Sequence, residues 1–551
     1  MLKEFMTNTP ISLNVTLQEF QKIFLQETTA FIQEKSGVNL SQNLETLTSA
    51  EIEKIVEIVA DIQSKIRANI FIPNDYKNFI VDFIMQILFE IWKKSDSSEI
   101  FFIKIRQYFT PAQIASSLFN YVKNFENYKW ATNFFAEHKQ IFPNSNKKIR
   151  TIGIYYFRIF NGGIERFLSL IIPIYIQQGY RVVLFTDVSV PELEYSLPPP
   201  YGGMFERVTF STPRNLTFER LQELATLIQK YSIDVFVSHM RTADFTPFVQ
   251  SLFCKLSGIK FVVELHSSIK HLDFRLPSVA GYCLADAVVV ISRTRREFLK
   301  NFDVRAYYIP NPIMIEKEGN FKGRDTKKFS NTILWVGRID VNEKNIFAVV
   351  PIMKEVVAQI PNAKLKILGA ADVPIIAEKL KELIKLNQLE KNIEFCGFHT
   401  DVSEFYKSAD VMLNTSPHEG WSLVISESKF YELPLVFFKL PDNELTRDGK
   451  GSIAVLFNNY HAAAKAIVKI LTDENFRIKL SAEARASLQP FLDYDIGAAW
   501  QRLFEDLEND IQTPQSNFEN VQIQKVFLEE IFEIQEQNNN LRLQIQNLSK
   551  N

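Results

Sequence analysis

This chain of 551 residues has few cysteines, a small net charge and few long apolar runs. The three cysteines (Cys254, Cys283 and Cys396) are scattered, odd in number and match no metal-ligand spacing. They argue against a disulfide framework or a structural zinc and favour a reducing compartment. The formal net charge of −2 lacks the basic excess that nucleic-acid binding usually needs. We therefore expect no nucleic acid among the partners.

No segment is apolar enough to predict a membrane span. The most apolar run, Phe79 to Trp92, is interrupted by Asp82 and Glu90 and is shorter than the ~20 residues that a spanning helix requires. The first ten residues carry acidic and polar side chains in place of the basic start and apolar core of a secretory signal. We expect a cytoplasmic protein, with peripheral contact to the inner face of a membrane left open.

Glycine and proline are also sparse, at 18 and 22 residues, which excludes collagen-like and long low-complexity sequence. The composition is that of a globular protein with sizeable cores, 46% hydrophobic and 23% charged.

At this length we expect several structural units. Residues 1–147 predict an all-helical domain, because apolar side chains recur there at helical spacing, as in Ile52, Ile55, Val56 and Val59.

Short apolar runs alternate with amphipathic helical segments from residue 148 onward, which predicts the α/β class. We expect two Rossmann-like doubly wound units, at 148–312 and 313–490, and a crossing helix at 491–512. Two such units in tandem place a ligand in the cleft between the carboxyl ends of their strands. The expected strands are 151–157, 181–187, 234–240, 261–266 and 287–292 in the first unit, and 332–337, 365–369, 393–397, 411–415 and 435–438 in the second.

Heptad spacing marks the segment 518–551. It fits either a lone amphipathic helix lying on the body or the seam of a coiled coil, in which one Asn at a core position fixes the register. The second interpretation predicts a homo-oligomer held by these residues, as a dimer or a trimer. The positions of the repeat are Phe527, Ile531, Ile534, Asn538, Leu541, Ile545 and Leu548.

Two glycines and two cations follow predicted strands. Gly162 and Gly163 open a helix directly after a strand, where glycines let the backbone approach a ligand and the helix N-terminus favours negative charge. A tight turn without a ligand is the alternative. Arg338 follows Gly337 at a strand end, with Lys344 six residues later. Two cations in this position suit a diphosphate, although solvated surface charges are the commoner fate of such residues.

Two acidic residues and a histidine complete the set. Glu419 and Glu427 lie eight apart around a predicted turn into a helix. The free N–H groups of the helix start can hold phosphate, and a carboxylate there can accept two sugar hydroxyls. A glycoside-cleaving carboxylate pair is the alternative, but that chemistry rarely comes with two cations and a phosphate-type helix start. His266 ends a predicted strand on the same cleft, where a structural and a functional role are equally open.

Together these residues resemble the retaining glycosyltransferases of family 4, which have the GT-B fold of two facing Rossmann-like domains. The resemblance covers roughly residues 149–512 and depends most on the Gly-Arg…Lys element and the Glu-x7-Glu element. It implies that Arg338 and Lys344 hold the donor diphosphate and that Glu427 binds the ribose hydroxyls. His266, Glu419, Arg338 and Lys344 are the catalytic candidates.

The same resemblance implies further contacts with the donor. Glu419 would contact the sugar, and the following backbone would contact sugar and phosphates. His266 would lie near the transferred sugar. The other residues expected to line the donor are Gly162 and Gly163 closing over the sugar, Gly397 and Phe398 beside the base, and Gly420, Trp421, Ser422, Leu423 and Val424 in the turn.

The sequence departs from the family pattern at Pro312, Ser422 and Glu432, where the family usually has glycine. Ser422 keeps its backbone N–H, so phosphate binding survives, and Glu432 is expected to bear a modest strain. The triplet Asp493 to Asp495 has the spacing of a metal-binding Asp-x-Asp, but it precedes the expected crossing helix and is interpreted as structural. We expect neither a metal nor a cofactor, because the two cations and a helix start can neutralise the leaving diphosphate.

The resemblance implies a transferase that moves a sugar, of hexosyl or N-acetylhexosaminyl type, from a nucleoside-diphosphate donor to an acceptor hydroxyl with retained anomeric configuration. The acceptor can be a glycan, a lipid-linked glycan or a protein. An inactive glycosyltransferase-like subunit of an active partner is the alternative. Loss of the cationic pair or of the carboxylate pair would distinguish it, and all four residues are present.

Overall fold

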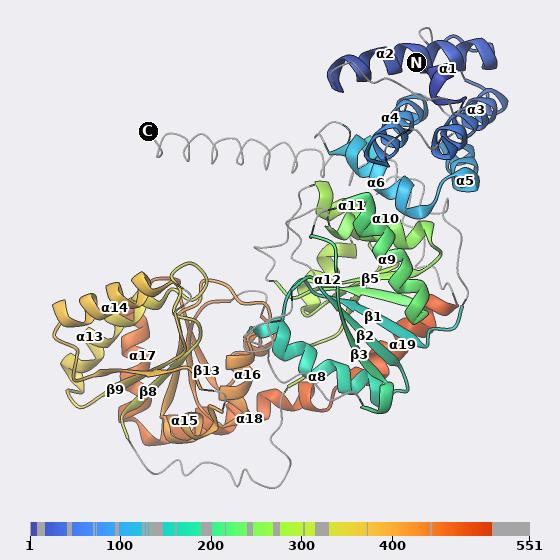
Figure 1. Cartoon of the computed structure of the whole chain (residues 1–551). Coiled ribbons are helices and arrows are strands. Elements are labelled where there is room, and N and C mark those ends of the chain that lie inside the picture. Colours follow the sequence, from blue (N-terminus) through green and yellow to red (C-terminus); the bar gives the residue numbers. More distant parts are fainter. Residues whose placement is uncertain are drawn as a thin grey trace.

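The structure is a computed structural model of the chain (Figure 1). It describes residues 2–7, 17–40, 47–69, 72, 74–93, 98–123, 127, 130–131, 147–159, 162–188, 201–214, 216–239, 246–267, 276–300, 304–313, 330–371, 373–399, 401–440 and 443–509. The heptad segment 518–551 lies outside these residues, so the coiled coil and the oligomer stay predictions.

The N-terminal region is helical, as expected. Its helices are α1 (Leu2–Phe5), α2 (Leu17–Ser36), α3 (Ser49–Ala68), α4 (Asn74–Lys93), α5 (Ser98–Tyr108) and α6 (Pro111–Val122). Thr48 and Thr110 begin α3 and α6 with capping boxes, in which the threonine hydroxyl accepts a hydrogen bond from the backbone N–H of Glu51 or Gln113, and the side chain of that residue accepts one from the backbone N–H of the threonine. The predicted apolar face of α3 is buried.

The first Rossmann-like domain has a seven-stranded parallel sheet in the order β3-β2-β1-β4-β5-β6-β7. It confirms the doubly wound prediction and adds β3 and β7, which the sequence analysis missed. Both are edge strands and are only partly buried, so neither shows a continuous apolar run. The strands are β1 (Thr151–Tyr155), β2 (Arg181–Thr186), β3 (Phe205–Thr209), β4 (Val235–Ser238), β5 (Lys260–Leu265), β6 (Ala287–Val290) and β7 (Ala306–Tyr308).

The second domain repeats this architecture with six parallel strands in the order β10-β9-β8-β11-β12-β13. The strand that the sequence analysis missed is again at an edge, the partly exposed β13. The strands are β8 (Thr332–Val336), β9 (Lys364–Leu368), β10 (Ile393–Gly397), β11 (Val411–Asn414), β12 (Leu435–Phe438) and β13 (Ser452–Val455).

Helices lie between most successive strands in both domains and cover the sheets (Figure 1). Such crossovers bury parallel strands on both faces, which explains their continuous apolar sequences. The helices of the first domain are α8 (Gly163–Gln177), α9 (Phe218–Tyr231), α10 (Thr246–Leu256), α11 (Leu276–Leu284) and α12 (Arg293–Lys300). Those of the second are α13 (Val349–Gln359), α14 (Pro374–Leu386), α15 (Ser403–Ser408), α16 (Leu423–Phe430), α17 (Tyr460–Thr472) and α18 (Glu474–Leu492).

The last described helix, α19 (Ile496–Glu508), returns to the first domain (Figure 1). Trp500 and Phe504 are buried there against Tyr175 of α8. Asp495 caps α19 by accepting a hydrogen bond from the N–H of Ala498, and Asp493 lies at the C-terminal end of α18. These two carboxylates therefore have structural roles at helix ends, as the sequence analysis expected.

The N-terminal helices and the first domain share one hydrophobic core. Helix α6 packs on α9 and α10, and Leu118 belongs to the same buried cluster as Phe248 and Leu252. The helical region is thus built onto the face of the first domain that carries α9 and α10. None of the helices that the structure describes combines the length and apolarity needed to cross a bilayer.

Candidate active site

The predicted residues follow strands at the two points where the strand order reverses. In the first sheet this point lies between β1 and β4, and in the second it lies between β8 and β11. Ligands of open α/β sheets bind at such points, outside the carboxyl ends of the strands. Gly162 comes after β1, Gly337 directly after β8, and Glu419 five residues after the end of β11.

The two domains touch at this place. A Cβ atom added to Gly420 would overlap the carbonyl oxygen of His266 in the opposite domain. Two ion pairs also join the domains, one between Arg166 and Glu427 and one between Arg293 and Glu444. The structure therefore brings the predicted residues of both domains to a common site, with the turn after Glu419 against the end of β5.

Lys344 and Glu419 form the central charge pair of the second domain. Lys344 Nζ lies 2.5 Å from Glu419 Oε1, and the two side chains are only 19% and 10% exposed. The hydroxyl of Ser416 donates to the same carboxylate oxygen at 2.8 Å. The hydroxyl of Thr415 donates to the carbonyl of Lys344 at 2.7 Å and fixes the loop that carries the lysine. The predicted cation and the predicted acid are thus already in contact, in a partly desolvated position.

Arg338 is placed differently from Lys344. Its side chain is 42% exposed, and it forms an ion pair of 2.6 Å with Glu343, which is equally exposed. The backbone just before it is tightly packed: Gly369 has φ +144°, and a Cβ there would overlap the carbonyl of Gly337. This close approach requires glycine at the end of β9. Arg338 therefore offers a solvated cation on a rigid strand end.

Glu427, the predicted ribose ligand, uses both carboxylate oxygens within the protein. Oε1 accepts a hydrogen bond from Arg166 Nη2 at 3.3 Å, and Oε2 accepts one from the hydroxyl of Tyr406 at 2.9 Å. Burial raises the pKa of the Glu427 carboxyl, while Arg166 and Tyr406 act in the opposite direction. Neither partner of Glu427 was identified by the sequence analysis, because each lies far from it in the sequence.

The turn into α16 begins the helix without a side-chain cap. Ser422 adopts φ +60° as the N-cap residue of α16, and its side chain does not cap the helix. The first N–H groups of α16 are therefore not capped by that side chain and can meet an anion. Trp421 packs its indole on Phe491 in the core, which leaves only its backbone for a ligand. Glu432 takes φ +56°, the left-handed conformation expected where the family has glycine.

The remaining predicted residues lie on both sides of the site. Gly162 is the extended N-cap residue of α8, and a Cβ there would crowd the Glu165 carboxylate, whereas a Cβ at Gly163 meets nothing within 4 Å. Gly397 has φ +77° at the end of β10, and Phe398 after it is 50% exposed. An exposed ring next to a glycine turn is available for stacking on a base.

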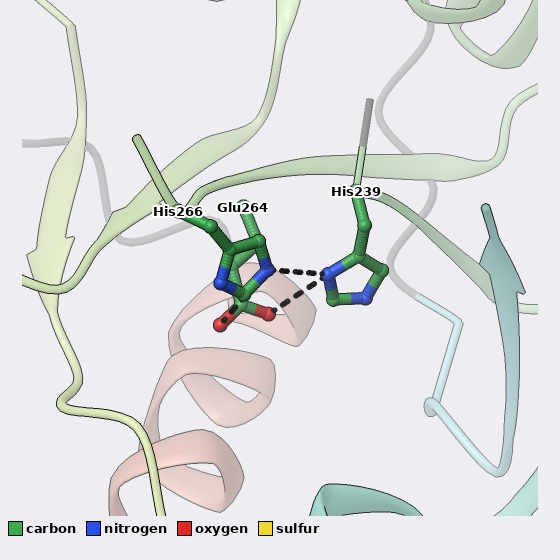
Figure 2. Close-up of side chains that lie close together, drawn as sticks. All are labelled: His239, Glu264 and His266. Carbon is green, nitrogen blue, oxygen red and sulfur yellow. Dashed lines mark hydrogen bonds and ion pairs between the residues drawn. The ribbon is translucent and has the colours of Figure 1, made fainter. Parts of the chain in front are cut away.

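His266 belongs to a buried polar group that sequence reasoning missed (Figure 2). Its Nε2 lies 2.9 Å from Nδ1 of His239, which follows β4, and Glu264 of β5 lies beside both rings. The exposed fractions of the side chains are 0% for His239, 1% for Glu264 and 10% for His266. We call these three residues the histidine–glutamate cluster. The available signal was an acidic residue within the otherwise apolar run of β5, with histidines after two adjacent strands.

Burial dominates the protonation of the histidine–glutamate cluster. It lowers the pKa of His239 well below its usual value and that of His266 to about 3, with Arg295 adding to the effect on His266. Burial also raises the pKa of the Glu264 carboxyl well above its usual value. Burial therefore acts against the charged form of each of the three groups.

Comparisons with known proteins match both Rossmann-like domains. Residues 161–317 match the family model described as Glycosyltransferase Family 4, and residues 330–473 match the one described as Glycosyl transferases group 1. An α-1,4-N-acetyl-D-galactosaminyltransferase of Campylobacter jejuni, named for a PP-undecaprenol-linked glycan, is 24% identical over 299 residues, 53% of this chain and 80% of the relative. The amylovoran biosynthesis glycosyltransferase AmsD of Erwinia amylovora is 30% identical over 179 residues, but these are 31% of this chain and only 49% of AmsD.

Solved structures show the same fold. The crystal structure of TarM superposes with a TM-score of 0.53 at 11% identity, covering 66% of this chain and all of TarM. HepE of Anabaena in complex with UDP gives a TM-score of 0.50 at 16% identity, again over 66% of this chain and all of HepE. At these identities the likeness concerns the arrangement of the two Rossmann-like domains.

Proposed function

Because this chain carries two glycosyltransferase domains in the GT-B arrangement, we propose that it is a transferase for a nucleoside-diphosphate sugar. It moves a sugar of hexosyl or N-acetylhexosaminyl type to an acceptor hydroxyl and retains the anomeric configuration. One observation carries the proposal: Lys344 and Glu419 are paired next to the start of α16, and the carbonyl of His266 lies against Gly420 from the other domain.

The charges of the second domain fit the leaving diphosphate. Lys344, Arg338 and the N–H groups of α16 supply positive charge where negative charge develops as the bond between the sugar and the phosphate oxygen breaks. Glu427 offers its carboxylate to the ribose hydroxyls. In the proposed front-face reaction the departing phosphate oxygen takes the proton of the acceptor hydroxyl, while the acceptor oxygen forms the new bond on the same face of the sugar. These groups need no metal ion.

The Lys344–Glu419 pair gives the donor two groups at once. When the diphosphate arrives, Lys344 exchanges its carboxylate partner for phosphate, and Glu419 becomes available to accept hydrogen bonds from the sugar hydroxyls. The exchange keeps a partly desolvated lysine and a partly desolvated carboxylate paired throughout, which avoids leaving either charge alone.

For the acceptor we propose a glycan on a lipid or polymer carrier. The relative from Campylobacter jejuni is named for a PP-undecaprenol-linked glycan, and a relative from Bacillus subtilis for poly(glycerol-phosphate). The helical region is built onto the first domain, which faces the acceptor in this arrangement, and so provides extra surface for a large acceptor. The alternative, an inactive binding subunit, is not favoured, since the cationic pair and the carboxylate pair are both retained in the sequence and Lys344 contacts Glu419.

A panel of nucleotide sugars tests the proposal. The purified protein is mixed with each of them, and thermal stabilisation and release of the nucleoside diphosphate are measured in parallel. We expect one donor to raise the melting temperature and to be hydrolysed or transferred, with both effects weakened in Lys344→Ala. Binding of a donor without any release, with or without glycan acceptors, would favour the inactive subunit. No binding of any donor would contradict both functions.

A further inference from the structure

Arg166 is a cation of the first domain that reaches the predicted ribose ligand of the second. It lies in the first turn of α8, where its backbone N–H donates to the carbonyl of Gly162 at 3.1 Å. Its Nη2 donates to Glu427 Oε1 at 3.3 Å, and both side chains are only 15% exposed. The ion pair therefore crosses from one domain to the other at a position that is largely shielded from water.

The second domain holds Glu427 in place without giving it a countercharge. The hydroxyl of Tyr406 donates to Glu427 Oε2 at 2.9 Å, and the buried ring of Tyr406 stacks on Tyr431. In the part of the chain that the structure describes, Arg166 is the one cation that forms an ion pair with Glu427. A carboxylate that is shielded from water is costly to keep ionised without such a partner. Burial accordingly raises the pKa of the Glu427 carboxyl, and the charge of Arg166 acts against this rise.

Glu427 keeps acceptor capacity for a ligand beside these two contacts. An ionised carboxylate offers about four lone-pair positions, and Arg166 and Tyr406 use one each. The positions that remain are enough for the two hydroxyls of a ribose. A protonated carboxyl would lose an acceptor position to its own proton, so the countercharge supports the full set of acceptors.

The second ion pair between the domains is built differently. Glu444 Oε2 accepts a hydrogen bond from Arg293 Nη1 at 3.1 Å, and its Oε1 accepts one at 2.7 Å from the backbone N–H of Arg293, where α12 begins. Arg447 lies 3.3 Å from the same Oε1, and the Glu444 side chain is 1% exposed. Two arginines and a helix start thus satisfy Glu444 within the protein, as expected of a carboxylate that ties two domains together. Glu427 has one cation and one hydroxyl, a set that suits a carboxylate with a further ligand.

We propose that Arg166 is a positioning residue of the donor site, which supplies the countercharge of Glu427 and orients its carboxylate toward the ribose hydroxyls. The proposal rests on the proposed function for the identity of the ligand. It makes ribose recognition a joint property of the two domains, because the carboxylate comes from one domain and its countercharge from the other.

Calorimetry of the full chain with UDP, GDP and their 2′-deoxy forms tests the proposal. The ratio of the dissociation constants of the deoxy and ribo forms measures the contact with the 2′-hydroxyl, because the base and the diphosphate are the same in both. We expect the wild type to prefer the ribo form about tenfold, since the deoxy form lacks a hydrogen bond to a charged group. Arg166→Gln should reduce this preference to about threefold or less. Arg166→Lys should retain most of it, because a single nitrogen of Arg166 makes the contact.

Two further variants separate this role from a tether between the domains. Arg293→Gln breaks the other ion pair between the domains and is the matched control, which should keep the preference of the wild type. Glu427→Gln should lower the preference, with no further loss when Arg166→Gln is added. A full preference in Arg166→Gln, or an equal loss in Arg293→Gln, would overturn the proposal. Loss of affinity by the same factor for the ribo and deoxy forms in Arg166→Gln would also overturn it and would place Arg166 on the diphosphate.

The pH dependence of the same ratio adds a readout that a merely structural role would not change. Among the residues that the structure describes, Arg166 of α8 and Tyr406 of α15 are the titratable groups that act on Glu427. Since the charge of Arg166 lowers the pKa of Glu427, Arg166→Gln should lose its remaining preference at a higher pH than the wild type as the pH falls. Curves that coincide would contradict the proposal.

Failure of this inference can be distinguished from failure of the proposed function. Binding of neither UDP nor GDP would contradict the proposed function and this inference together. Binding of one of them, with a preference for the ribo form that does not depend on Arg166, would contradict this inference alone.

Discussion

The two domains contribute groups of opposite character to the same site. We call the histidine–glutamate cluster of the first domain the first wall, and the ion pairs Lys344–Glu419 and Arg338–Glu343 of the second domain the second wall. The first domain contributes the desolvated histidine–glutamate cluster, in which burial disfavours the charged form of each group. The second contributes ion pairs with solvent access, Lys344 with Glu419 and Arg338 with Glu343. Fixed charges suit a ligand that is itself an anion, whereas neutral acceptors suit hydroxyl groups. The difference indicates that donor binding depends on the second wall, and orientation of the sugar and acceptor on the first.

The division of roles between the two domains depends most on the contact between Gly420 and His266, where the domains meet. In Gly420→Ala the new Cβ meets the carbonyl of His266, so the domains must separate by about an ångström. Since a misplacement of about 1 Å can cost about a hundredfold in rate, we expect kcat/KM to fall by about that factor. Calorimetry should show donor affinity changed less than about threefold, because the second wall stays intact. Turnover like that of the wild type would mean that the walls are further apart in the reacting enzyme.

Removal of the cations tests the second wall directly. We expect Lys344→Ala to raise the dissociation constant of the nucleoside diphosphate tenfold to a hundredfold, since one charged hydrogen bond contributes about 1.5–3 kcal/mol. Arg338→Ala should have the smaller effect, because Arg338 is solvated. Lys479→Ala, at a lysine that is 72% exposed, is the matched control. Unchanged affinity in both variants would place the donor elsewhere.

The pH dependence of donor binding tests Glu427. Burial raises the pKa of its carboxyl, and only the ionised form accepts hydrogen bonds from both ribose hydroxyls. As the pH is lowered, the wild type should therefore begin to lose donor affinity at a higher pH than an ordinary glutamate at this position would cause. The diphosphate can gain a proton as well, so the same titration of Glu427→Gln gives the part of the loss that is due to the ligand. We expect the wild type to lose more affinity than Glu427→Gln; parallel curves of affinity against pH for the two proteins would exclude Glu427 as the ribose ligand.

The smallest expected effect is that of a chelator. If Lys344, Arg338 and the start of α16 neutralise the diphosphate, then EDTA should leave turnover within about twofold of the untreated rate. Turnover that stops with EDTA and returns only with Mg²⁺ or Mn²⁺ would contradict the idea that the charges of the second wall suffice.

Sequence reasoning could name more candidates in the second domain than in the first. Arg338, Lys344 and Glu419 are charged residues that follow predicted strands, and Glu427 was added through its spacing from Glu419 and the resemblance to family 4. His239 and Glu264 could not, because their meaning depends on β4 and β5 pairing in parallel, which brings residues 25 apart in sequence into contact. A histidine or a glutamate inside a hydrophobic run looks like an isolated polar residue until the sheet is assembled.

The fold was predictable to a similar extent. The central strands are buried on both faces and show as apolar runs, whereas β3, β7 and β13 lie at sheet edges, where side chains meet solvent on one side.

The partners of Glu427 could not be predicted from the sequence for a different reason. Arg166 comes from the other domain and Tyr406 from the short helix α15, so only tertiary packing brings them to the carboxylate.

Helix α19 makes the first domain discontinuous in sequence. Its core includes Trp500 and Phe504, which are synthesised after the whole second domain. The second domain, by contrast, is one unbroken insertion from β8 to α18. Domains tend to fold as units while the chain emerges from the ribosome. The first domain begins to emerge earlier, but it can complete its core only after the inserted domain has been made, so the order of completion reverses the order of synthesis.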